Sequence, residues 1–204
     1  MTSRLAGYEL RLPDGWTVVP SGLADPDAWA HEQASRLVAG QESAERPAGA
    51  MLADGLAAVV RAVGDAGVAG LETAVLVRRP ELGRVDALLT VVAQRDLPPE
   101  VFAADLEELV RESDDDHLFA QAVEGTVPAG EVRGAHLMIG HLDPDVGDGV
   151  AHLEERVALG VFPDGTPDML EVTAIASSVG SFTDMPQEII DALAGLTVEL
   201  EGTA

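Results

Sequence analysis

The chain contains no cysteine among its 204 residues. This absence excludes disulfides, zinc–thiolate centres and cysteine nucleophiles. Lysine is absent too, since all 12 basic residues are arginine, and Schiff-base chemistry and lysine-dependent phosphate chemistry are therefore excluded. Aromatic residues make up only 3% of the chain, so its core must be built from alanine, valine, leucine and isoleucine.

Positive charge is scarce. The chain has 36 acidic residues against 12 basic ones, which gives a formal net charge of −24. A charge of this sign and size repels phosphate backbones and anionic lipid head groups, so we expect neither nucleic acid nor a membrane surface as a partner. A cationic partner is compatible with the charge, and so is solubility alone.

Long apolar runs are also missing. No stretch is long enough for a membrane span or for the apolar region of a signal peptide, which predicts a cytoplasmic protein. The chain is nevertheless 47% hydrophobic, an ordinary value for a globular protein. Its length predicts one domain that covers residues 1–204.

The segment Leu12–Trp16 reads Leu-Pro-Asp-Gly-Trp and lies between two β-like runs, Tyr8–Leu12 and Trp16–Val19. Proline presets φ, aspartate bonds its own backbone and glycine tolerates positive φ, so the segment predicts a β-hairpin. The same turn chemistry recurs at Pro163–Gly165.

Hydrophobic periodicity and turn residues divide the rest of the chain into helices and strands. The predicted helices cover 25–38, 47–63 and 98–112. A last predicted helix follows Pro186 and has its apolar positions at Ile189, Ile190, Leu193 and Leu196. The predicted strands cover 71–77, 85–95, 122–127, 131–142, 151–162 and 170–179. The strand over 170–179 is predicted to be central because small residues occupy both its faces, and the inward face of the strand over 151–162 is predicted to consist of Leu153, Val157, Leu159 and Val161. Tight turns join consecutive strands, which favours an α+β domain with a largely antiparallel sheet, helices packed on its faces and a helical insertion over 25–69.

The order of these elements resembles the PsbP-like superfamily, which includes many bacterial proteins. The resemblance rests on the Leu-Pro-Asp-Gly-Trp hairpin, the acidic helix opened by Pro98-Pro99, the strand with Gly125, and Glu131–Gly134. It implies an α/β/α sandwich and a non-catalytic role as an accessory or partner-binding protein. The insertion over 25–69 departs from the family pattern, and no functional residue of the family matches a position here.

One segment has the spacing of a calcium loop. Asp143, Asp145 and Glu154 fit positions 1, 3 and 12 of such a loop, which are oxygen ligands. Gly147 and Asp148 occupy positions 5 and 6 and break the pattern. An acidic, glycine-rich turn between two strands is the favoured interpretation, so these residues are weak metal candidates.

Three histidines, His136, His141 and His152, bracket the same segment, and neutral imidazoles are good metal ligands. His136 and His141 differ by an odd number, so in a strand they point to opposite faces. We therefore expect separate, partly solvated histidines without a shared ion.

The sequence predicts no catalytic residue and no cofactor, because searches for nucleophile elbows, phosphate loops and metal-protease motifs find none. The predicted function is that of a non-enzymatic accessory or protein-interaction domain that binds a protein partner or a second copy of itself. Trp29 is the candidate partner contact, with core packing as its other interpretation. The alternative function is a small-molecule or cation-binding domain with a cleft between sheet and helices.

Overall fold

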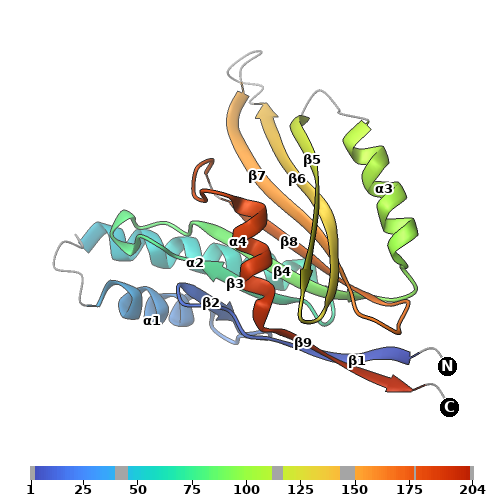
Figure 1. The fold of residues 1–204 in the computed structure, drawn as a ribbon. Helices are drawn as coiled ribbons and strands as arrows, with labels where there is room; N and C mark the ends of the chain where they lie inside the picture. The colour runs from blue at the N-terminus through green and yellow to red at the C-terminus, as the bar shows by residue number, and fades with distance from the viewer. Residues whose placement is uncertain (1–2, 40–45, 112–116, 143–149, 177, 203–204) are drawn as a thin grey trace. The chain divides into compact units, whose positions relative to one another are not determined.

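A computed structural model of the chain describes residues 3–39, 46–111, 117–142, 150–176 and 178–202 (Figure 1). The chain forms two compact units. Unit 1 comprises residues 1–13 and 91–204, and unit 2 comprises residues 14–90. The predicted helical insertion over 25–69 lies within unit 2.

Unit 2 pairs two helices with a small group of strands. Its elements are β2 (Trp16–Val19), α1 (Pro26–Val38), α2 (Arg46–Ala66), β3 (Glu72–Leu76), the 3₁₀ helix η1 (Pro80–Leu82) and the first half of β4 (Ala87–Gln94). The predicted start of α1 is confirmed, because Asp25 is its N-cap and accepts a 2.9 Å hydrogen bond from the Ala28 amide. Alanine, valine and leucine side chains of α1, α2, β2 and β3 form the core of this unit.

Unit 1 contains the longer strands. Its elements are β1 (Ser3–Leu10), α3 (Pro99–Arg111), β5 (His117–Val127), β6 (Gly130–Leu142), β7 (Val150–Phe162), β8 (Met169–Ala176), α4 (Met185–Ala192), the 3₁₀ helix η2 (Leu193–Gly195) and β9 (Leu196–Gly202). Strands β5 to β8 pair antiparallel with their sequence neighbours.

The predicted fold class is confirmed: the fold is α+β, with a seven-stranded sheet in the order β2-β3-β4-β8-β7-β6-β5 and a separate pair, β1-β9. β8 is the middle strand, as the small residues on both its faces predicted. Among the residues that the structure describes, no helix combines the length and apolar character needed to cross a membrane.

Helices α3 and α4 pack on opposite faces of strands β5–β7 (Figure 1). A Cβ at Gly125 of β5 would lie 3.0 Å from the Ile190 Cδ1 of α4, so α4 comes close to the sheet there. A Cβ at Gly160 of β7 would lie 3.3 Å from the Phe102 ring of α3, on the other face. Strands β5–β7 therefore have a helix on each face, and β5 stands at the end of the sheet order.

The predicted hairpin at the start of the chain is wrong. The turn itself forms, with Gly15 at a φ of +94°, but the strands on its two sides pair elsewhere. β1 pairs with β9, where Leu10 lies opposite Leu196, and β2 pairs with β3. A turn motif reverses the chain locally, whereas the strand partner is chosen by long-range pairing that local chemistry does not encode.

The last predicted helix is correct in place but too long. α4 ends at Ala192 and a 3₁₀ turn leads into β9 at Leu196, which the periodicity had assigned to the helix. A Cβ at Gly195 would lie 2.1 Å from the Arg11 carbonyl oxygen, so only glycine fits the turn. The close approach of two chain segments, invisible in local sequence, thus sets this boundary.

Candidate functional site

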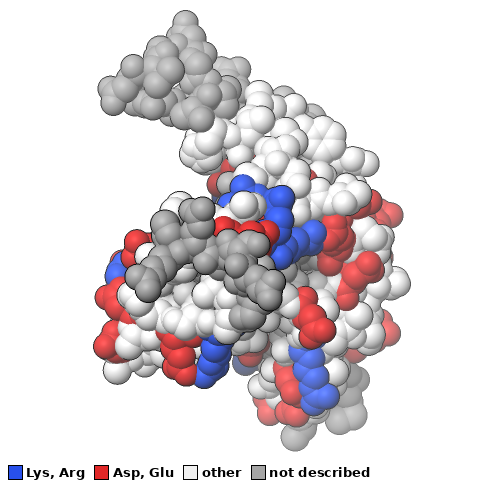
Figure 2. Space-filling view, turned by 90° about the vertical axis from the view of Figure 1, so that its left-hand side faces the viewer, with Lys and Arg blue, Asp and Glu red and all other residues white. Residues whose placement is uncertain are grey.

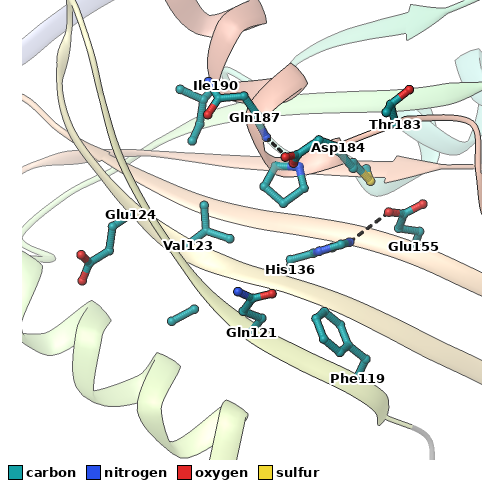
Figure 3. Close-up of a pocket in the computed structure, with 13 residues that line it drawn as sticks. Phe119, Gln121, Val123, Glu124, His136, Glu155, Thr183, Asp184, Gln187 and Ile190 are labelled. Carbon is teal, nitrogen blue, oxygen red and sulfur yellow. Dashed lines mark hydrogen bonds and ion pairs between the residues drawn. The ribbon is translucent and has the colours of Figure 1, made fainter.

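The candidate site of unit 1 is a groove of about 480 Å³ between α4 and strands β5, β6 and β7 (Figure 3). Its apolar lining includes Phe119, Val123 and Ile190. Its polar lining includes His136 and Glu155. Ligand sites in proteins commonly have this size and mixture of linings.

Strand alternation brings the sheet side of the groove together. Gln121 of β5 lies opposite His136 of β6, and His136 lies opposite Val157 of β7. Phe119 and Val123 flank Gln121 at two-residue spacing, and Glu155 lies two residues before Val157. Because side chains alternate along a strand, all of these project from the face that α4 covers.

His136 and Glu155 form a pair at the base of the groove. The His136 Nε2 lies 3.0 Å from the Glu155 Oε1, and the two side chains are 17% and 9% exposed. The Phe119 ring stands edge-on to the imidazole, with ring centres 5.4 Å apart. The pair therefore lies diagonally across two adjacent strands and is held by packing as well as by its hydrogen bond.

The other wall is the beginning of α4, where carboxylates already occupy the backbone donors. The Asp184 Oδ1 accepts a 3.2 Å bond from the Gln187 amide, and the Glu188 Oε1 accepts a 2.8 Å bond from the Thr183 amide. These two negative groups offset the positive end of the helix dipole. This helix start therefore offers little to an anion.

The second candidate feature of unit 1 is the outer edge of β5. β5 ends the sheet, and within the described chain β6 is its one strand neighbour. It runs for 11 residues, and Leu118 and Phe119 on its two faces are 55% and 41% exposed. The strand at the other end of the sheet order, β2, has only four residues.

Of the three weak metal candidates, the structure describes only Glu154. Asp143 and Asp145 lie outside the described residues. Glu154 is paired, since the Arg156 Nη2 lies 2.6 Å and the His141 Nε2 lies 3.2 Å from its oxygens. Within the described ranges, no group of three or more histidine, aspartate, glutamate or cysteine side chains is arranged to hold a metal ion.

The predicted separation of the histidines holds for His136 and His141 and is wrong for His141 and His152. His136 pairs with Glu155, whereas His141 pairs with Glu154 on the opposite face of the sheet. The His141 ring stacks on His152, with ring centres 4.2 Å apart. His136 therefore belongs to the groove, and the other two histidines do not.

Trp29, the candidate partner contact, lies in α1 of unit 2. Its side chain packs against the buried core of that unit and remains partly exposed. Core packing explains its position, and a role in partner binding stays a prediction.

Two other buried carboxylates have structural roles. The pKa of Asp168 is raised by burial but lowered more strongly by its hydrogen bonds to the Leu5 and Asp96 amides and by Arg4, so the net shift is downward. Its oxygens accept bonds of 3.0, 3.1 and 2.7 Å from these groups. Asp86 accepts a 2.8 Å bond from the Arg78 amide and a 3.3 Å bond from the Arg84 Nε.

Glu155 is not among the predicted site residues, although the sequence contains a signal for it. Leu153 and Val157 were assigned to the inward face of β7, and Glu155 lies between them with the same parity. A charged residue at an inward position is unusual in a strand and indicates either a paired charge or a site.

Comparison with known proteins gives little guidance. No protein-family model matches the chain, and no curated protein does. One solved structure, of a protein from Bacteroides thetaiotaomicron VPI-5482, covers 99% of this chain at 10% identity with a TM-score of 0.46. The chain spans about half the length of that protein, since the match covers 50% of it.

Proposed function

We propose that this chain is a non-enzymatic interaction module that binds an extended, basic segment of a partner protein along the edge of β5. The observation that carries the proposal is that the long strand β5 lies at the edge of the sheet, with Leu118 and Phe119 exposed. An added strand would satisfy the outward backbone groups of β5, the mode in which many domains recognise extended peptides.

β5 has few of the devices that normally protect a sheet edge. Such strands are usually short, interrupted by proline or lined with charge. β5 is 11 residues long, contains no proline, and has Glu124 as its one acidic residue and no arginine. Its one irregularity is a register shift between His117 and Phe119. Most of its length is therefore suited to pairing.

The charge of the molecule indicates the chemistry of the partner. Acidic side chains are spread over the face seen in Figure 2, with basic side chains in small groups among them. With a net charge of −24, long-range attraction favours a basic segment, and it opposes nucleic acid, an acidic segment or a second copy. The resemblance to the PsbP-like superfamily supports an accessory role, and membership of that family is part of this proposal.

The experiment uses two synthetic nine-residue peptides in which valine alternates with lysine or with glutamate. We expect the lysine peptide to bind the full chain in a fluorescence anisotropy titration and the glutamate peptide not to bind. The variant Phe119→Lys, which places a protecting charge on the edge, should weaken binding of the lysine peptide roughly tenfold or more. Val179→Lys is the matched control, because Val179 is 44% exposed but lies outside the sheet.

Equal binding of both peptides would contradict the basic character of the partner. If the Phe119 and Val179 variants weaken binding of the lysine peptide equally, the effect comes from the added charge alone and the β5 edge has no role. A dimer in light scattering that Phe119→Lys converts to a monomer would make a second copy the occupant.

A further inference from the structure

The groove under α4 contains a nearly buried carboxylate, Glu155, with a single hydrogen-bond partner in the described part of the chain. The Glu155 side chain is only 9% exposed, and His136 is its one hydrogen-bond partner in the described part of the chain. An ionised carboxylate has about four positions at which it can accept a hydrogen bond. Glu155 therefore has acceptor capacity left over, on a side chain that lines the groove.

The other buried carboxylates of this protein have their negative charge balanced by backbone amides and a guanidinium group. Asp168 has two backbone amides and the Arg4 guanidinium, and Asp86 has one amide and the Arg84 guanidinium. Glu155 has neither an amide nor a guanidinium. The neighbouring Arg156 pairs with Glu154, on the opposite face of β7.

The remaining walls suit a cation with an apolar body. Phe119, which is 41% exposed, presents its ring near the imidazole, and Val123 and Ile190 add apolar surface (Figure 3). An aromatic ring also attracts a cation placed over its face. The carboxylates of Asp184 and Glu188 at the start of α4 oppose an anion at the same place.

The groove base lies too far from the β5 edge to be filled by the same partner. Glu155 belongs to β7, two strands in from β5. With strands about 4.8 Å apart, a segment added to β5 would run roughly 14 Å from β7. A side chain of that segment would have to cross both β5 and β6, so a small free molecule is the better occupant.

We propose that this groove binds a small organic monoamine, with its ammonium group at Glu155 and its apolar part against Phe119 and Val123. The site shares Phe119 with the β5 edge, but its charged group, Glu155, lies two strands away from that edge. Glu155 accepts hydrogen bonds from the ammonium, while His136 holds the carboxylate in place.

The test is isothermal titration calorimetry of the full chain with 2-phenylethylammonium at pH 8, above the range in which an ordinary imidazole titrates. The controls are 2-phenylethanol, which has the same shape without the charge, and 3-phenylpropionate, which has the opposite charge. A charge-assisted hydrogen bond predicts that the amine binds about 10- to 100-fold more tightly than the alcohol. The carboxylate should not bind.

Two matched variants locate the site. Glu155→Gln keeps the shape and removes the charge, and should lower amine affinity by the same roughly 10- to 100-fold. Glu154→Gln changes the adjacent residue on the opposite face and should leave amine affinity unchanged. Circular dichroism melting checks that both variants fold.

The proposal is overturned if the alcohol binds as tightly as the amine, or if the amine does not bind. It is also overturned if Glu154→Gln lowers amine affinity as much as Glu155→Gln. The comparison of ligands uses the unchanged protein, so it decides the matter even if Glu155→Gln fails to fold.

Discussion

Single carboxylates have different roles in this protein according to their partners. Asp168 has a fully buried side chain and joins β1 to the segments around residues 96 and 168 through Arg4 and two amides. Glu155 is nearly as buried but has one partner and lines a groove. The number of donors around each carboxylate, more than its burial, separates a structural residue from a candidate binding residue.

The lowered pKa of Asp168 has a consequence for stability. Because the folded-state pKa lies below that of the unfolded chain, the carboxylate stabilises the fold above the ordinary aspartate range, and this contribution is lost as pH falls through the folded-state pKa. At neutral pH, Asp168→Asn should lower the free energy of unfolding by about 2 kcal/mol. Urea unfolding of both proteins between pH ~7 and ~3 should show the difference shrinking as pH falls.

The exposed Asp164, four residues earlier, provides the control. Asp164→Asn should change the unfolding free energy by less than about 0.5 kcal/mol. A difference between Asp168→Asn and the unchanged protein that is constant over the whole pH range would contradict the ionised role of Asp168.

At the level of elements, the sequence predicts each α-helix and most strands, because caps, turn residues and periodicity act locally. Asp25 with Pro26 identifies the start of α1, and alternation in β7 identifies its inward face. The same local patterns do not determine which strands pair with each other. The start of β9 is predicted as part of the preceding helix, and the opening turn is predicted to form a hairpin. Both predictions are wrong because the correct structure depends on the pairing of β1 with β9, a strand at the far end of the chain.

The candidate site was less predictable than the fold. The parity of Glu155 and the opposite faces of His136 and His141 can be read from sequence. The groove itself requires the packing of α4 on β5, at Gly125 and Ile190, and the edge position of β5 requires the strand order. Both are long-range features that no local pattern contains.

The N-cap of α1 gives a testable prediction about a single helix. Asp25→Ala removes the acceptor for the Ala28 amide, so the free energy of unfolding should fall by about 1 kcal/mol. Chemical denaturation monitored by circular dichroism measures the change. Asp14→Ala, at an exposed turn position before β2, should have less than half this effect, and an equal effect would contradict the capping role.

The whole molecule is dominated by its negative charge. With 36 acidic and 12 basic residues, the native state is opposed by repulsion among its own side chains. This repulsion is long-ranged, and salt weakens it. Salt does not weaken the hydrophobic cores of the two units. The same charge provides the preference for a basic partner at the β5 edge.

Thermal unfolding should therefore depend on ionic strength. Raising sodium chloride from about 0.02 M to about 0.5 M shortens the screening length several-fold, so the unfolding midpoint should rise by several degrees. Differential scanning calorimetry measures the midpoint, and a midpoint that falls with added salt would show that attractive ion pairs outweigh the repulsion.

Amide hydrogen exchange along β5, with and without the alternating valine–lysine peptide, tests the central proposal most directly. Strand addition predicts slower exchange at alternate amides of residues 117–127, those that point away from β6, with no comparable change in β2. Unchanged exchange in β5 at a peptide concentration that saturates the protein, or protection confined to other strands, would contradict the account.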